Sequence, residues 1–288
     1  MLGAMLPEDV RPAKPPIPLV DDPDRVVFYV PRYMGPLSDL ELIARMPNLR
    51  VVQLLTAGFD NALRYVPRGV TLCNAGGVHD ASTAELAVGL ILASLRGLDE
   101  FARAMPSGAW VYARREALAD KRVLVIGAGG VGRAVQRRLE PFETDVTMAA
   151  RTARPGVVAT SDVGVLLPTV DVVVLAVPLT EDTTGLVDDA FLSHMREGAL
   201  LVNVARGPVV DTDALVRHVA AGRIRAAVDV TDPEPLPPGH PLWVLPGVII
   251  SPHVGGNTSA FLPRARRLVE GQMRRFASGE PLASVVSR

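Results

Sequence analysis

Short runs of aliphatic and β-branched residues alternate along the chain with longer segments whose apolar residues recur every three or four positions. Near Val26 the order is RVVFYV, LSDLELIARM, LRVVQLLT and GVTLCNA. A second, longer series starts at Lys121 with KRVLVIG and GVGRAVQRRLEPF, and it closes with IRAAVDV and GVIISP. Continuous apolar strands between amphipathic helices are typical of parallel sheets covered on both faces. We therefore predict an α/β protein with two doubly wound parallel-sheet domains.

The segment ASTAELAVGLILASLRGLDEFA, which separates the two series, predicts a long helix. Ser82 and Glu85 have the spacing of a capping box, which places the start of the helix at Ser82. The residues that follow are apolar on nearly every side, so we expect this helix to be buried between the domains and against a second subunit. Residues 1–24 are rich in proline and charge and predict a loose N-terminal arm.

Composition and charge exclude several classes of function. The formal net charge of the 288 residues is −1, and lysine and arginine are scattered, so we expect no nucleic-acid partner and no anionic membrane surface. The single cysteine, Cys73, excludes an intramolecular disulfide and a cysteine-cluster metal site, and we expect no metal. We find neither a signal-peptide pattern nor an apolar run approaching ~18 residues, which favours a cytoplasmic protein with no membrane span.

A glycine motif follows the strand KRVLVIG. Gly127, Gly129 and Gly132 have the G-x-G-x-x-G spacing, between a predicted strand and a predicted helix. In this context Gly127 makes a tight turn, Gly129 lets a pyrophosphate approach the backbone, and Gly132 lets helix and strand pack closely. The motif therefore predicts a dinucleotide site, with Gly130 and Val131 in the same loop.

The next strand, DVTMAAR, ends without the acidic residue that holds the ribose 2′-hydroxyl of NAD. Arg151, Thr152 and Arg154 occupy this region instead. A guanidinium can pair with a 2′-phosphate, whereas a carboxylate would repel it. We therefore expect NADP as the cofactor, with NAD still possible; the alternative is that these arginines are solvated surface charges.

Ionisable residues follow three later strands: Arg206 in NVARGPVVD, Glu234 in VDVTDPEPL and His253 in VIISPHVGG. Because ligands bind beyond the carboxyl ends of parallel strands, we expect all three in one cleft. The set suits carbonyl reduction: His253 supplies a proton, Glu234 orients the imidazole, and Arg206 binds a carboxylate and polarises the neighbouring carbonyl. His79 is a weaker candidate for the same cleft. Arg32 could contact a second anionic group or could be a surface residue.

With these residues in place, the chain resembles the D-isomer-specific 2-hydroxyacid dehydrogenases, and within them the glyoxylate/hydroxypyruvate reductases. The resemblance runs from Val26 to Val286 through LLTAGFDNA, STAELAVGLILASLR, VIGAGGVG, LAVPLTEDTTGLV, NVARGPVVD, VDVTDPEPLPPGHPLW, SPHVGGNT and GEPLASVV. It implies a flavodoxin-like substrate domain, residues 25–81 and 262–288, and a Rossmann NAD(P)-binding domain, residues 82–261. It also implies a homodimer.

The resemblance assigns roles to individual residues. It implies that Arg206, Glu234 and His253 are catalytic, and that the backbone of Ala57, Gly58 and Phe59 holds the substrate carboxylate with Arg206. The cofactor-lining positions that it implies beyond the glycine loop and the arginines are Thr83, Val177, Pro178, Thr183, Val204, Ala205, Asp229, His253 and Gly255.

Two functions therefore remain open. The first is an NADP-preferring oxidoreductase that transfers a hydride between NADPH and a small 2-oxo acid or D-2-hydroxy acid. The second is a dinucleotide-binding regulator of the corepressor type, with little or no turnover.

Overall fold

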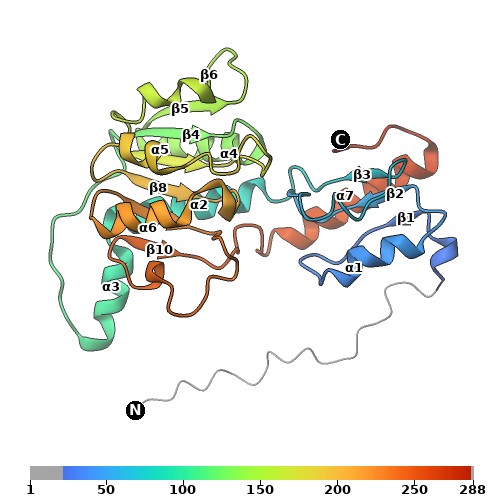
Figure 1. The fold of residues 1–288 in the computed structure, drawn as a ribbon, viewed down its shortest axis with the longest axis horizontal. Coiled ribbons are helices and arrows are strands. Elements are labelled where there is room, and N and C mark those ends of the chain that lie inside the picture. Colours follow the sequence, from blue (N-terminus) through green and yellow to red (C-terminus); the bar gives the residue numbers. More distant parts are fainter. Residues whose placement is uncertain (1–21, 287–288) are drawn as a thin grey trace.

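The computed structural model describes residues 22–286 and contains two parallel sheets, one of seven strands and one of three. The larger sheet and its helices form one body, and the smaller sheet lies beside it together with the last helix of the chain (Figure 1). Most of the predicted N-terminal arm lies outside the described residues. At its end, Pro23–Arg25 form a short 3₁₀ helix, η2.

The larger sheet has the strand order β10-β9-β8-β7-β4-β5-β6, and all of its neighbouring strands are parallel. The order runs outward from β4 in both directions, which is the doubly wound order of dinucleotide-binding domains. The strands are β4 (Arg122–Ile126), β5 (Asp145–Ala150), β6 (Val157–Ala159), β7 (Val172–Leu175), β8 (Leu200–Asn203), β9 (Arg225–Val228) and β10 (Val248–Ile250). The connecting helices are α4 (Gly130–Leu139), η5 (Glu140–Phe142), η6 (Thr160–Val165), α5 (Asp189–His194), η7 (Gly207–Val209), α6 (Thr212–Ala220) and η8 (Pro241–Trp243).

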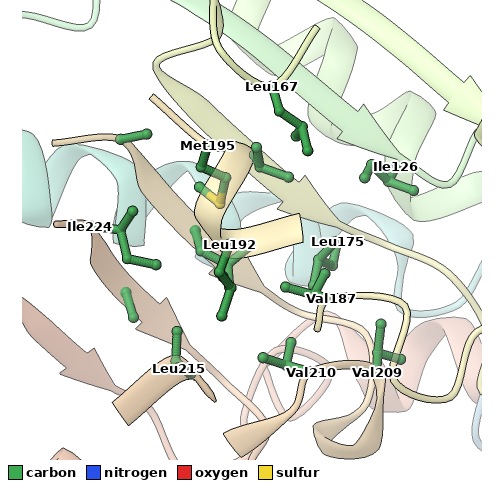
Figure 2. Close-up of a cluster of buried hydrophobic side chains, with 14 of the residues drawn as sticks. Ile126, Leu167, Leu175, Val187, Leu192, Met195, Val209, Val210, Leu215 and Ile224 are labelled. Atoms are coloured by element: carbon green, nitrogen blue, oxygen red, sulfur yellow. The ribbon is translucent and has the colours of Figure 1, made fainter. Parts of the chain in front are cut away.

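Burial of the central strands explains their apolar sequences. Every residue of β7 and β8 is buried, as expected for strands covered on both faces. On one face the core includes Leu175 of β7 and Leu192 of α5, together with Leu215 of α6 (Figure 2). Ala87 and Ile91 lie in the core on the opposite face. The seven-stranded sheet therefore has the doubly wound form that the sequence predicts.

The smaller sheet differs from the prediction. Its strands are β1 (Phe28–Tyr29), β2 (Val51–Gln53) and β3 (Thr71–Cys73), in the simple order β1-β2-β3. This order has no reversal, so within residues 22–286 the sheet is parallel but not doubly wound. The physical reason is that the chain leaves β3 for a helix that packs on the other sheet. Among the described residues, only an antiparallel bridge between Cys73 and Val285 adds to the edge of β3. Between β1 and β2 lie α1 (Ser38–Glu41) and η3 (Leu42–Arg45).

The last helix, α7 (Phe261–Ser278), returns to the small sheet (Figure 1). The amide Nε2 of Gln272 donates to Oε1 of Gln53 at 2.7 Å, and both side chains are buried. The ring of Phe276 packs edge-on against Phe28, with 5.5 Å between the centroids. The small sheet and the last helix therefore pack together, although they lie far apart in the sequence.

Helix α2 (Asp80–Arg96) is the long helix between the sheets. The prediction that it begins at Ser82 is wrong, because the helix begins at Asp80 and His79 is its N-cap. Ser82 is buried, and its hydroxyl bonds the hydroxyl of Thr258 at 2.8 Å instead of capping the helix. Glu85 pairs with Arg138 on α4 at 3.2 Å, so a tertiary partner replaces each half of the expected capping box.

Helix α3 (Leu98–Ala104) and η4 (Met105–Ser107) follow α2 and extend away from the large sheet (Figure 1). In the described part of the chain no single helix is long and apolar enough to cross a membrane. Helix α2 reaches the length and hydropathy of a membrane span only when residues 98–107 are added to it, and the two segments are bent by 67° relative to each other.

Candidate active site

A cavity of about 530 Å³ lies between the two sheets and receives side chains from both. This volume is in the range of small-molecule sites. A smaller cavity of about 150 Å³ adjoins it and shares several of its lining residues, so the two form one cleft. Of the residues expected at the site, the cleft is lined by Ala57, Gly58, Phe59, Thr83, Val131, Val177, Pro178, Val204, Ala205, Arg206, Asp229, Glu234, His253 and Gly255.

His253 and Glu234 form a hydrogen-bonded pair at this cleft. Nδ1 of His253 donates to Oε1 of Glu234 at 2.6 Å, and both side chains are partly exposed. The bond fixes the orientation of the ring and places the proton on Nδ1 when the ring is neutral. Nε2 has no hydrogen-bond partner among the described residues, so it is free to exchange a proton with a ligand.

The backbone of His253 has a left-handed conformation, with φ of 51°. This region is unusual for a residue other than glycine, although histidine enters it more readily than most. The N–H of His253 donates to the carbonyl of Asp229 at 2.7 Å, which helps to hold the turn. Such a conformation persists only where the surrounding contacts impose it, and it is often found at functional sites.

Asp229 supplies those contacts. Its buried carboxylate accepts hydrogen bonds from the Ser251 hydroxyl at 2.6 Å and from the amides of Val254 and Gly255 at 2.9 Å each. Three bonds to one carboxylate fix the turn that carries His253. Asp229 also lines the cavity, so it combines this structural role with a position at the site.

Arg206 lies at the turn after β8, at the junction of the two cavities. Its Nη1 donates to the carbonyl of Ala205 at 2.7 Å, and Nε lies 3.4 Å from Oδ1 of Asp60. Asn203 braces the turn, because its amide donates to the Arg206 carbonyl at 3.0 Å and its oxygen accepts from the Ala205 amide at 3.0 Å. The next position, 207, requires glycine, because a Cβ there would overlap the carbonyl of Thr231.

The segment Ala57 to Phe59 faces Arg206. The Asn74 amide donates to the Ala57 carbonyl at 2.8 Å, and the Thr56 hydroxyl donates to the Gly58 carbonyl at 2.7 Å. These bonds engage the carbonyl oxygens, whereas the N–H groups of residues 57–59 have no partner in residues 22–286. Free amides beside a guanidinium can bind a carboxylate. Gly58 has no side chain to obstruct the guanidinium, since a Cβ there would overlap Nη2 of Arg206.

The glycine loop opens α4 as the sequence predicts. Gly127 has φ of 115°, and a Cβ on it would overlap the Ala176 carbonyl, while a Cβ on Gly132 would overlap the Gly127 carbonyl. A Cβ on Gly129 would meet nothing within 4 Å, so the backbone is open to a ligand there. The free N–H groups of the first turn of α4 and its dipole together favour an anion. These residues fit the pyrophosphate of a dinucleotide.

At the end of β5 the three expected polar residues have different environments. The side chain of Arg151 is 87% exposed and lies 3.9 Å from Asp182. Thr152 is also exposed. Arg154 is directed to the glycine loop, where its Nη2 donates to the carbonyl of Ala128 at 3.2 Å.

Two candidates have other partners. The Thr183 hydroxyl donates to the Pro178 carbonyl at 2.7 Å and accepts from the Thr180 amide at 2.8 Å, so it braces its own loop and does not line the cleft. Arg32 binds both carboxylate oxygens of Asp39, at 2.6 and 2.7 Å. Its guanidinium, which also holds the pKa of Asp39 below its usual range, does not line the cleft.

Sequence reasoning missed several residues at the cleft, among them Asp60 and Tyr33. Asp60 pairs with Arg206, although no local pattern links the two positions. Tyr33 lines the larger cavity and stacks on Phe261, with 4.0 Å between the ring centroids. Burial and the charge of Asp229 raise the pKa of the Tyr33 hydroxyl. His79, the weaker candidate, lines the same cavity, and its Nε2 donates to the Leu55 carbonyl at 2.8 Å.

The fold and the cleft define a two-domain dinucleotide-binding protein with a hydrogen-bonded His–Glu pair at the cleft. Residues 88–255 match the family described as D-isomer specific 2-hydroxyacid dehydrogenase, NAD binding domain. The chain belongs to this family of oxidoreductases.

Several relatives align with most of the chain. A glyoxylate reductase from Thermofilum pendens is 33% identical over 266 residues, covering 87% of this chain and 78% of that protein. A crystal structure of a D-isomer specific 2-hydroxyacid dehydrogenase from Xanthobacter autotrophicus Py2 in complex with NADPH and MES is 32% identical, with a TM-score of 0.80 and coverage of 92% and 86%. A crystal structure of an NADPH-dependent glyoxylate/hydroxypyruvate reductase from Sinorhizobium meliloti in complex with NADP and sulfate is 26% identical, with a TM-score of 0.82 and coverage of 94% and 88%.

Proposed function

We propose that this protein reduces a small 2-oxo acid of the glyoxylate or hydroxypyruvate type to a D-2-hydroxy acid with NADPH. The observation that carries the proposal is the cleft itself, in which the His253–Glu234 pair and Arg206 lie beside the free amides of residues 57–59. The names of the relatives from Thermofilum pendens and Sinorhizobium meliloti support the substrate class.

In the proposed reaction, each of the cleft residues has a separate role. NADPH, when bound on the glycine loop, supplies a hydride to the substrate carbonyl carbon. Arg206 and the amides of residues 57–59 bind the carboxylate, and Arg206 stabilises the charge that develops on the neighbouring carbonyl oxygen. Nε2 of His253 gives its proton to that oxygen, while Glu234 holds the ring in position through its bond to Nδ1. In the oxidative direction His253 takes the proton back.

The preference for NADP is part of the same proposal. The end of β5 carries Arg151, Thr152 and Arg154 and lacks the acidic residue typical of NAD sites. The Xanthobacter autotrophicus and Sinorhizobium meliloti relatives were crystallised with NADPH and NADP. Arg154 already lies against the glycine loop, where a nucleotide ribose would follow the pyrophosphate.

We also propose a homodimer that forms through the nucleotide domain. Large apolar side chains are exposed on and after α3: Met105 is 77% exposed, and Trp110 and Tyr112 are each 93% exposed. Exposed aromatic residues on an extended segment are typical of a surface that a second subunit covers. The proposed domain boundaries are residues 25–81 with 262–288 for the substrate domain and 82–261 for the nucleotide domain.

The test incubates the protein with NADPH and each of a panel of small 2-oxo acids. Turnover is measured as the loss of NADPH absorbance at 340 nm, and the configuration of the product is determined by chiral analysis. The proposal predicts turnover of glyoxylate or hydroxypyruvate, and a D product wherever the product is chiral. Tight NADPH binding without turnover of any small 2-oxo acid would instead favour a regulator of the corepressor type.

A further inference from the structure

Two guanidinium groups meet at one carbonyl oxygen in the glycine loop. Nε of Arg133 donates to the carbonyl of Ala128 at 3.2 Å, and Nη2 of Arg154 donates to the same oxygen at 3.2 Å. Arg133 comes from α4, whereas Arg154 comes from the turn between β5 and β6. Two cations that share one acceptor are close enough to repel each other, which an anion bound between them would relieve.

The position of Arg133 is unfavourable for the helix itself. Helix α4 begins at Gly130, so Arg133 lies in or beside its first turn, where the positive end of the helix dipole opposes a cation. No carboxylate lies within 4.0 Å of Arg133 or Arg154 among the described residues. Most of the N–H donors of both groups are also without a partner there, since each makes a single side-chain hydrogen bond.

The backbone of Arg154 is held in place by its turn. Its N–H donates to the Val157 carbonyl at 2.9 Å, and the Val157 N–H donates back to the Arg154 carbonyl at 2.8 Å. Gly156 closes this turn with φ of 74°. Arg133 and Arg154 are exposed residues, as is Arg151. Arg151 differs from them because it lies 3.9 Å from the carboxylate of Asp182 and makes no hydrogen bond to the glycine loop in the described part of the chain.

We propose that Arg133 and Arg154 form a two-arginine clamp for the 2′-phosphate of NADP, and that Arg133 is a specificity-determining residue. This inference rests on the proposed use of NADP. The Ala128 carbonyl holds both guanidinium groups at the loop that receives the nucleotide, and their remaining N–H groups bind the phosphate from two elements. Arg151 adds a weaker, solvent-exposed contact.

The test measures binding alone, by isothermal titration of the full chain with 2′,5′-ADP and with 5′-AMP. Arg133→Gln and Arg154→Gln should each weaken 2′,5′-ADP about 10- to 100-fold, as expected for lost charge-assisted hydrogen bonds, and should change 5′-AMP by less than about twofold. Arg137→Gln is the matched control, because Arg137 is an exposed arginine in the last turn of the same helix. It should leave both affinities unchanged.

The melting temperature of the Arg133→Gln variant should equal or exceed that of the wild type, because the substitution removes a cation from the start of α4. Wild-type affinity for 2′,5′-ADP in this variant would overturn the clamp. So would an equal loss for both ligands, which would indicate a general role in shaping the loop. Because no turnover is measured, the clamp can stand even if the chain reduces no 2-oxo acid, and it can fail in an active NADPH-dependent enzyme.

Discussion

Replacing Gly58 with alanine tests whether the guanidinium of Arg206 holds the substrate. A Cβ at position 58 would overlap Nη2 of Arg206 and lie 2.6 Å from Cζ, closer than side chains pack. Gly58 does not have a positive φ, so alanine fits its backbone without strain. The three nearest atoms all belong to the guanidinium of Arg206, so the end of this flexible side chain must move.

The size of the effect follows from that displacement. A shift of about 1 Å in a group that positions the substrate can cost roughly 10²-fold in rate. The loss of hydrogen bonds to a charged carboxylate costs about 1.5–3 kcal/mol, which is a similar factor. We therefore expect kcat/KM for a 2-oxo acid to fall about 100-fold in Gly58→Ala. The free energy of unfolding should stay the same or rise by less than about 1 kcal/mol, as for glycine-to-alanine changes at compatible sites.

The assay compares kcat/KM for glyoxylate and hydroxypyruvate with the dissociation constant of NADPH, measured by fluorescence. NADPH affinity should not change, because Gly58 does not belong to the glycine loop. Gly271→Ala on α7 is the control, since a Cβ there meets nothing within 4 Å. Wild-type kcat/KM in a folded Gly58→Ala variant would refute the assignment of the substrate carboxylate to Arg206.

Three further predictions address the acid–base pair, the cofactor and the fold. Glu234→Gln should lower kcat/KM about 10²-fold, because the ring of His253 loses the carboxylate that orients it; an unchanged kcat/KM in the folded variant would show that the pair does not act in catalysis. Arg151→Ala should weaken NADPH more than NADH in fluorescence titrations, and equal losses would contradict a 2′-phosphate contact. Arg32 lowers the folded-state pKa of Asp39, so the pair stabilises the fold at neutral pH, and this contribution is lost as the pH falls from about 4 through the lowered value. Asp39→Asn should therefore lower the urea midpoint more at pH 7 than near pH 2; equal losses at both pH values would contradict this sign.

The larger sheet could be predicted because its signals are local. Continuous apolar strands, amphipathic helices and the glycine motif that follows Ile126 and opens α4 each depend on neighbouring residues alone. The meeting of Arg206, Glu234 and His253 at one cleft follows from a rule of topology, since the carboxyl ends of parallel strands share one edge of the sheet.

Other features depend on contacts that no local pattern encodes. Ser82 does not cap helix α2, which begins at Asp80; its hydroxyl bonds that of Thr258, a residue 176 positions away in the sequence. The small sheet keeps the order β1-β2-β3 because the chain leaves it for the larger body after β3. The approach of Arg133 to Arg154 arises only when α4 and the turn after β5 pack on the same carbonyl. Each of these features is determined by tertiary contacts and could be recognised only in the structure.

The central claim is that His253 is the proton donor of an NADPH-dependent reduction. Asparagine is the suitable replacement, because it accepts the left-handed backbone found at this position, with φ of 51°. We predict that His253→Asn binds NADPH as tightly as the wild type and reduces glyoxylate or hydroxypyruvate at least about 10²-fold more slowly at neutral pH. Wild-type turnover by the folded His253→Asn variant would contradict the account.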